Sequence, residues 1–229
     1  MRFFEYLSEV FFPSVCVTCG ISVANDKQLF CAECLSQTVF TNFQTAYNNE
    51  MMDRLISIKV LKNAFAPLYF KKNGRLKELF YKIKYGNRPD IAKKMATYLC
   101  QEWQNCEKND FKVDGICYVP IHTVKLSKRG YNQSEIIARE ISESLNIPLL
   151  HFLERKKNIE TQTHFGRMDR LKNQEGTIVY NSSKIVNHLI IVDDIMTTGA
   201  TIETCYNAIR LKNANCSISV LTLAVTDSW

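Results

Sequence analysis

The sequence lacks an apolar run of the length that a transmembrane helix requires, so we expect no membrane insertion. Its aromatic N-terminus also lacks the basic start, long apolar centre and small-residue cleavage site of a secretory signal peptide. Internal repeats and low-complexity segments are absent as well. We therefore expect a cytoplasmic protein, whose 9 cysteines are mostly reduced or bound to metal rather than paired in disulfides.

Length and charge set broad limits on the fold and the ligand. A chain of 229 residues can form one sizeable domain together with a small module. The formal net charge of +6 is compatible with an anionic ligand without requiring one. Five cysteines are spread singly along the chain, and we interpret them as small core residues: Cys100, Cys106, Cys117, Cys205 and Cys216.

Four cysteines near the N-terminus form two Cys-x-x-Cys pairs: Cys16 with Cys19, and Cys31 with Cys34. Two turns of this kind can bring four thiolates into a tetrahedron, which is the geometry of a structural zinc site. The alternatives are a redox motif, which would need one pair at the start of a βαβ unit, and two chance pairs. We predict a zinc module in residues 1–40, followed by a larger domain in residues 41–229.

Hydrophobic periodicity predicts helices and strands that alternate along most of the chain. The expected helices cover residues 1–12, 75–85, 90–104, 133–145 and 202–211. The expected strands cover residues 67–70, 116–120, 149–153, 177–180, 189–192 and 217–224, and the segment 36–65 offers only a candidate strand at 55–60. This alternation predicts an α/β fold with a mostly parallel sheet flanked by helices. The loops 121–132, 154–174 and 193–201 should then lie together at one edge of the sheet.

The segment 189–201, with the sequence LIIVDDIMTTGAT, is the most informative part of the chain. Its apolar start predicts a buried parallel strand, which leads into the carboxylates Asp193 and Asp194. The loop that follows opens a helix, and unpaired N–H groups at a helix start favour a phosphate. The carboxylates suit ribose hydroxyls and the hydration shell of Mg²⁺. Adjacent aspartates alone occur in many α/β proteins, but the whole segment fits a ribose 5-phosphate that carries a pyrophosphate and a metal.

Such a ligand would contact several loops at this edge of the sheet. We expect the 5-phosphate to contact Thr197, Thr198, Gly199, Ala200 and Thr201, where Gly199 lets the backbone approach closely. The basic loop 121–132 is the candidate pyrophosphate site, through His122, Lys128, Arg129 and Gly130. A solvated basic turn is the alternative, and His122 is more readily interpreted as a structural hydrogen-bonding residue than as a base. The candidate catalytic residues are Asp193, Asp194, Arg129 and Lys128, which would act by positioning and charge stabilisation.

The long polar segment 154–174 is typical of a lid or of a mobile loop. A lid would exclude water from an oxocarbenium-like state when the bond between C1 of the ribose and the pyrophosphate breaks. Its candidate contact residues are Thr161, Gln162, Arg167 and Arg170.

The segment 189–201 is similar to the phosphoribosyl-pyrophosphate (PRPP) loop of type I phosphoribosyltransferases. Nearly the whole chain resembles the competence protein F (ComF, GntX-like) family. The motifs that carry this resemblance are Cys16-x-x-Cys19-Gly20, Cys31-x-x-Cys34, Ile83-Lys84-Tyr85-Gly86, Val119-Pro120-Ile121-His122, Lys128-Arg129-Gly130-Tyr131-Asn132-Gln133, Thr161-Gln162-Thr163 and residues 192–201. The resemblance implies a type I phosphoribosyltransferase fold with a zinc module, and a role in natural transformation or DNA uptake in bacteria. It suggests single-stranded DNA and the uptake helicase and translocation proteins as partners.

Two further functions stay open at this point. The protein could be a single-stranded DNA-binding accessory factor that uses the zinc module, the basic lid and the aromatic residues Tyr81, Tyr85 and Trp103. It could instead be a regulator that binds PRPP without turnover. Thr197 stands where purine-salvage enzymes often carry a third acid, which argues against a hypoxanthine- or guanine-type acceptor. The sequence identifies neither the acceptor nor a general base.

Overall fold

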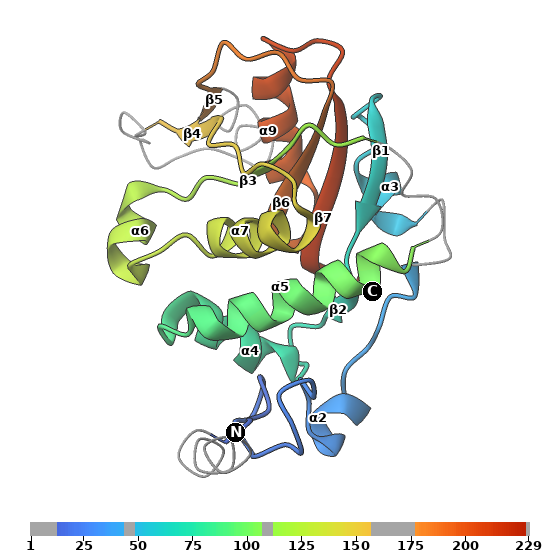
Figure 1. The fold of residues 1–229 in the computed structure, drawn as a ribbon, viewed down its shortest axis with the longest axis vertical. Coiled ribbons are helices and arrows are strands. Elements are labelled where there is room, and N and C mark those ends of the chain that lie inside the picture. The colour runs from blue at the N-terminus through green and yellow to red at the C-terminus, as the bar shows by residue number, and fades with distance from the viewer. Residues whose placement is uncertain (1–12, 44–48, 107–111, 157–176, 228–229) are drawn as a thin grey trace, which may run out of the picture.

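The computed structural model describes residues 13–43, 49–106, 112–156 and 177–227 (Figure 1). The helix predicted for residues 1–12 and most of the predicted lid lie outside the described residues. Figure 1 shows an upper α/β part and, below it, a small N-terminal module.

The larger part is built on a five-stranded parallel sheet. Four of its strands lie in the order β1-β7-β6-β3, and β2 pairs with β7 farther along the same edge as β1. The strands are β1 (Leu61–Phe65), β2 (Leu68–Phe70), β3 (Gly115–Tyr118), β6 (His188–Met196) and β7 (Ser217–Thr226). β6 and β7 lie in the middle, and nearly all of their residues are buried because helices cover both faces of the sheet.

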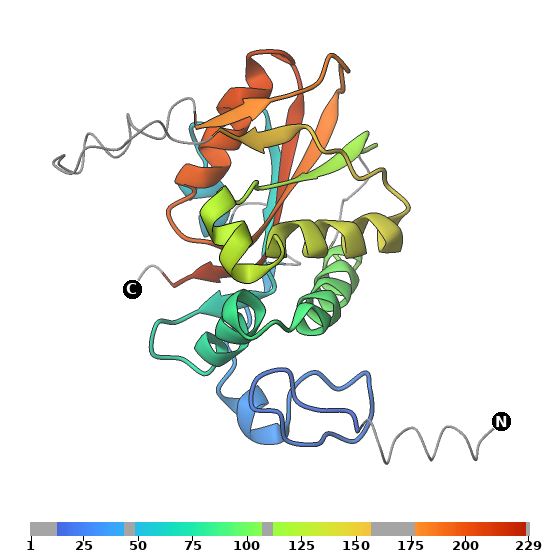
Figure 2. The ribbon, with the colours of Figure 1, turned by 90° about the vertical axis from the view of Figure 1, so that its left-hand side faces the viewer.

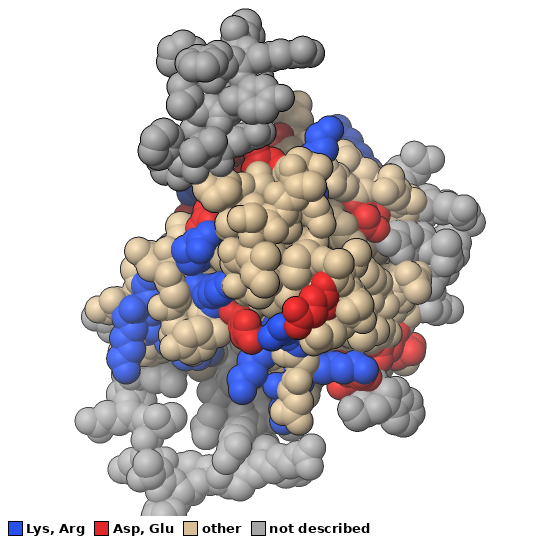
Figure 3. All heavy atoms as spheres, turned by 90° about the horizontal axis from the view of Figure 1, so that it is seen from below, with Lys and Arg blue, Asp and Glu red and all other residues tan. Residues whose placement is uncertain are grey.

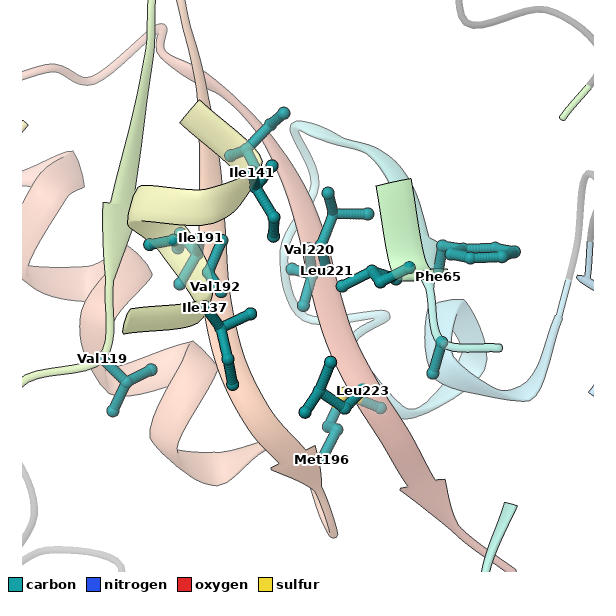
Figure 4. Packing of buried hydrophobic residues seen from close by; sticks show 14 of the residues in the cluster. Phe65, Val119, Ile137, Ile141, Ile191, Val192, Met196, Val220, Leu221 and Leu223 are labelled. Atoms are coloured by element: carbon teal, nitrogen blue, oxygen red, sulfur yellow. The ribbon is translucent and has the colours of Figure 1, made fainter. Parts of the chain in front are cut away.

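Helices cover the sheet on two sides (Figure 2). α5 (Pro89–Gln104) and α7 (Gln133–Leu145) pack together on one face, and α9 (Ala200–Arg210) lies on the other. Each helix turns an apolar stripe inward, as the spacing of residues Ile137, Ala138 and Ile141 in α7 illustrates. Figure 4 shows apolar side chains of α7, β6, β7 and β1 that form this core. The predicted α/β class, with a mostly parallel sheet flanked by helices, is confirmed.

Strands β4 (Leu153–Arg155) and β5 (Ile178–Tyr180) form a separate antiparallel pair. The strand predicted for residues 149–153 is therefore wrong in most of its length, since only Leu153 lies in β4. Leu149 instead makes a single parallel bridge to Ile116 of β3. The backbone hydrogen bonds of this segment to β3 are limited to those between Ile116 and the residues Pro148 and Leu150, which are too few to make a strand. The segment 154–174 consequently starts from the small sheet and not from the parallel one.

Two short helices were not apparent from the sequence. α3 (Glu50–Arg54) begins at Asn49, whose side chain accepts hydrogen bonds from the N–H groups of Met51 and Met52. The strand predicted for residues 55–60 is wrong, because the chain turns there and β1 starts only at Leu61. α6 (Thr123–Arg129) lies within the predicted loop 121–132, and it has no buried residue to reveal it.

The N-terminal module packs against α4 (Leu76–Tyr85). It contains α2 (Ala32–Ser36), from which Glu33 forms an ion pair of 2.7 Å with Arg75. Lys82 of α4 donates a hydrogen bond to the carbonyl of Thr18. A boundary of the module at residue 40 stays a prediction. Within the part of the chain that the structure describes, every helix is too short or too polar to cross a membrane.

Candidate functional site

A cleft of about 180 Å³ opens at the carboxyl ends of β3 and β6. These strands are parallel neighbours, so the loops that follow them meet at one edge, where ligands of open α/β sheets bind. The cleft contains two carboxylates and four cations. Its lining residues are Lys84, Val119, Pro120, Ile121, Lys125, Arg129, Asn132, Gln133, Ser134, Arg155, Asp193, Asp194 and Thr201. A smaller hollow of about 20 Å³ adjoins it along the loop 197–201 and also reaches Asp193.

Both aspartates lie inside β6, which continues to Met196 and thus beyond the strand end predicted at Val192. Asp193 Oδ1 accepts hydrogen bonds from Ser134 Oγ at 2.8 Å and from the N–H of Asp194 at 2.9 Å. Asp194 is only 5% exposed, and its Oδ2 lies 2.8 Å from Nζ of Lys84. Burial and the neighbouring charge of Asp194 raise the pKa of Asp193 to about 7. The pair therefore carries fewer than two full negative charges near neutral pH.

The loop 197–201 is held in position by a hydrogen bond from α3. Arg54 of α3 donates a hydrogen bond of 2.8 Å to the carbonyl of Thr197, and further bonds to Thr226 at the end of β7. Gly199 has φ +85° and precedes α9, and a Cβ at this position would lie 2.7 Å from Cδ2 of Leu55. The requirement for glycine thus comes from the left-handed backbone and from Leu55. The sequence had suggested a different reason, close approach of a phosphate to the backbone.

The basic segment 121–132 owes its arrangement to α6. His122 caps this helix by accepting a hydrogen bond from the N–H of Val124, and Gly130 ends it with φ +79°. Lys125 and Arg129 are four residues apart, share a helix face and both line the cleft. Lys128 is exposed and, like His122 and Gly130, is not among the residues that line the cleft.

Arg129 is held in place before any ligand arrives. Its guanidinium lies 5.0 Å from the ring centroid of Tyr85 and donates hydrogen bonds to Tyr85 Oη at 3.2 Å and to Gln133 Oε1 at 3.0 Å. The hydrogen bond from Arg129 lowers the pKa of Tyr85. A guanidinium fixed in this way can bind an anion with little further loss of side-chain freedom.

Several residues of the cleft were not assigned a role from the sequence, among them Lys84, Lys125, Ser134 and Arg155. Lys84 is part of the motif Ile83-Lys84-Tyr85-Gly86, but nothing in the sequence indicates that α4 reaches β6. The predicted lid contacts Thr161, Gln162, Arg167 and Arg170 lie outside the described residues.

The four N-terminal cysteines come together as predicted. Their Sγ atoms all lie within 4.8 Å of one another, with 3.7 Å between Cys19 and Cys31. Burial opposes ionisation of Cys16, but N–H groups of Cys19, Cys31 and Thr18 outweigh it and lower the pKa of Cys16 to about 6. Four soft ligands at this spacing fit a tetrahedral zinc ion.

Comparison with known proteins supports the resemblance. No family model matches the chain. Competence protein F of Haemophilus influenzae is 28% identical over 138 residues, which are 58% of this chain and 60% of that protein. DNA utilization protein YhgH of Salmonella typhimurium is 24% identical over 216 residues, which are 93% of this chain and 85% of that protein. Competence protein ComFC of Streptococcus pneumoniae is 25% identical over 134 residues, which are 58% of this chain and 56% of that protein.

Among the solved structures similar to this one, two adenine phosphoribosyltransferases have low TM-scores and low sequence identity. The adenine phosphoribosyltransferase of Trypanosoma brucei has a TM-score of 0.39 and 10% identity, over 69% of this chain and 82% of that one. The enzyme of Leishmania tarentolae has a TM-score of 0.38 and 8% identity, over 83% of this chain and 94% of that one. Scores this low carry no functional argument.

The described residues define an α/β protein with a cleft at the carboxyl edge of a parallel sheet and a Cys₄ cluster. Its resemblance to the competence protein F family is confirmed at modest sequence identity.

Proposed function

We propose that the cleft binds PRPP together with Mg²⁺, and that the protein transfers the phosphoribosyl group to an acceptor that is not identified. The observation that carries this proposal is a cleft that joins the Asp193–Asp194 pair to four cations and that adjoins, at Asp193 and Thr201, the small hollow along the loop 197–201. A sugar with a phosphate at one end and a pyrophosphate at the other needs these three kinds of contact.

In this proposal, the N–H groups at the start of α9 and the hydroxyls of the loop 197–201 bind the 5-phosphate. Asp193 and Asp194 accept hydrogen bonds from the ribose hydroxyls. Arg129 and Lys125 bind the pyrophosphate and stabilise the charge that develops on it as it leaves. Lys128, which the sequence had assigned to this task, lies outside the cleft but adds to the positive field around it. The acceptor completes the exchange by forming the new bond to C1 of the ribose and releasing inorganic pyrophosphate.

The donor set also fits a magnesium ion. Oδ2 of Asp194 is buried and lies 2.8 Å from the ammonium of Lys84, with no further hydrogen-bond partner within the described part of the chain. Hard carboxylate oxygens are the ligands that Mg²⁺ prefers, usually through water. Bound there, the ion would neutralise part of the pyrophosphate charge. Closure of the segment 154–174 over the ligand stays a prediction.

We also propose that Cys16, Cys19, Cys31 and Cys34 hold a structural zinc ion, which stabilises the N-terminal module. The module has a small core of its own, so metal binding would provide much of its stability. Its ion pair and hydrogen bond with α4 would carry this stability to the helix that borders the cleft.

The names of the relatives suggest the cellular process in which this chain acts. Two are named competence proteins and one a DNA utilization protein. We propose that this chain also acts in DNA uptake or utilization, in the cytoplasm, with helicase or translocation proteins as candidate partners. The match covers less than two thirds of competence protein F and of ComFC. The role of those whole proteins is therefore a proposal for this chain.

Single-stranded DNA binding is a second candidate function. Tyr81 and Tyr85 are 64% and 62% exposed, their ring centroids lie 5.4 Å apart, and Arg129 stands beside them. Bases could stack on such a pair. The assignment of Trp103 to this surface is wrong, because Trp103 is 5% exposed and packs against Phe65. On the lower face of the described residues, Lys and Arg are interspersed with Asp and Glu rather than forming a continuous basic track (Figure 3).

Calorimetry with PRPP and Mg²⁺, followed by an assay of pyrophosphate release with candidate acceptors, tests the proposal. The proposal predicts binding of PRPP and faster pyrophosphate release with the correct acceptor. Binding without release in any acceptor mixture would favour a PRPP-sensing regulator. Indifference to PRPP, together with DNA affinity that falls steeply as salt rises, would favour the DNA-binding function.

A further inference from the structure

Lys84 occupies an unusual position in the cleft. It comes from the last turn of α4, outside the layers that carry the other cleft residues, and it lines the same cleft as Arg129. The carbonyl of the preceding residue, Ile83, accepts a hydrogen bond from the hydroxyl of Tyr131, which fixes this end of the helix beside the site. The backbone beside Lys84 is therefore anchored, while its four-carbon side chain is long enough to let the ammonium reach more than one partner.

The ammonium of Lys84 forms an ion pair of 2.8 Å with Asp194. The side chain of Asp194 is 7% exposed and that of Lys84 24% exposed, so water solvates the pair poorly. Removing one member of such a pair leaves an uncompensated charge, which is costly. The two groups therefore neutralise each other until something better replaces both contacts.

The proposed ligand offers such a replacement. A cation or a set of hydroxyl donors can take over Asp194, and an anion can take over Lys84. A cation alone would leave Lys84 without its partner, and an anion alone would leave Asp194 without its partner. Only a ligand that brings both kinds of group satisfies both side chains at once.

We propose that Lys84 is a pyrophosphate-binding residue that exchanges Asp194 for the pyrophosphate when PRPP and Mg²⁺ bind. This inference rests on the proposed function and names a residue and a coupling that the proposed function does not require. The exchange makes the affinities for the anion and for Mg²⁺ depend on each other, and this coupling is reciprocal. A purely structural Lys84, which only neutralises the buried Asp194, would contribute nothing to anion binding.

Calorimetry with inorganic pyrophosphate, with and without Mg²⁺, separates these two roles. Lys84→Met should weaken pyrophosphate binding in the presence of Mg²⁺ by about ten- to hundredfold, the range for loss of a charged hydrogen-bond partner. Lys77→Met is the matched control, because Lys77 is exposed on the same helix and does not line the cleft. It should bind pyrophosphate like the wild type.

Asp194→Asn supplies a second test that does not depend on the folding of Lys84→Met. This change frees the ammonium of Lys84, so metal-free pyrophosphate should bind more tightly than to the wild type. The double variant Lys84→Met with Asp194→Asn contains neither charge and should lose this gain. Unchanged metal-free affinity in Asp194→Asn, or equal affinities in the single and double variants, would overturn the role of Lys84.

Binding measurements on the wild-type protein distinguish failure of the partner exchange from failure of the proposed function. If it binds PRPP with Mg²⁺ but Lys84→Met binds pyrophosphate equally well, the partner exchange is wrong and the proposed function stands. If the wild type binds neither PRPP nor pyrophosphate, both are wrong.

Discussion

Replacing Asp193 by asparagine should make the protein more stable at pH 8 and less able to bind its ligand. The carboxyl group of Asp193 is enclosed by the cleft and lies next to Asp194, and both effects raise its pKa to about 7. In the unfolded chain it ionises near 3.8. The folded state therefore keeps a proton that the unfolded state has already released. The contribution of Asp193 to stability consequently falls as pH rises from about 4 to about 7, and this contribution is constant above that range.

The size of this effect follows from the two pKa values. Each pH unit between them corresponds to about 1.4 kcal/mol, which gives an upper limit of about 4 kcal/mol. Asp193 is partly open to the cleft, so solvent screening reduces the expected gain to about 2 kcal/mol. Asparagine can still accept the hydrogen bond that Ser134 donates to Asp193, so the substitution removes the charge with little change of contact.

Urea unfolding of wild type and Asp193→Asn at pH 4, 6 and 8 measures the effect as a difference between the two proteins. The free energies of unfolding should be similar at pH 4, and the variant should be more stable by about 2 kcal/mol at pH 8. Glu143→Gln, an exposed change on α7, should follow the wild type at each pH. Parallel stability curves for Asp193→Asn and wild type would refute the account of this carboxylate.

Three other predictions test the remaining parts of the structure. Purified protein should contain about one zinc per chain. Cys31→Ser should release the zinc and loosen the N-terminal module, while circular dichroism shows that the α/β core is still folded. Full zinc occupancy in a Cys16→Ser, Cys31→Ser double variant would contradict this prediction. Gly199→Ala should lower the free energy of unfolding by about 1–2 kcal/mol and weaken ribose 5-phosphate binding, and adding Leu55→Ala should recover only part of the loss, because it relieves the contact but not the left-handed backbone. Arg54→Met should weaken ribose 5-phosphate binding several-fold without altering zinc content, since it frees the loop 197–201 from β7; unchanged affinity would show that Arg54 does not position the loop.

The long elements could be predicted because their sequence pattern and their burial agree. α4, α5 and α7 carry apolar residues at helical spacing, and the short runs of apolar, largely β-branched residues in β6 and β7 are typical of buried strands. The two Cys-x-x-Cys pairs likewise determine the Cys₄ cluster, because each pair supplies two ligands locally. α3 and α6 escaped prediction because each is too short to show a periodic stripe.

The candidate site could be predicted only where its residues follow one another in the chain. Asp193, Asp194 and the loop 197–201 were found in this way, whereas Lys84 reaches the cleft through the packing of α4 below the sheet. The prediction of Lys128 as a pyrophosphate-binding residue illustrates the same limit, because Lys125 lines the cleft and Lys128 does not. In a loop the two lysines are equivalent, but in the helix α6 only Lys125 shares the face of Arg129.

The central claim is that Asp193 and Asp194 belong to a PRPP site, and calorimetry with PRPP and Mg²⁺ on the double variant Asp193→Asn, Asp194→Asn tests it most directly. The account predicts that the binding free energy falls by about 2–4 kcal/mol in a protein that remains folded by circular dichroism, while Glu143→Gln binds like the wild type. A folded double variant that binds PRPP and Mg²⁺ as tightly as the wild type would contradict it.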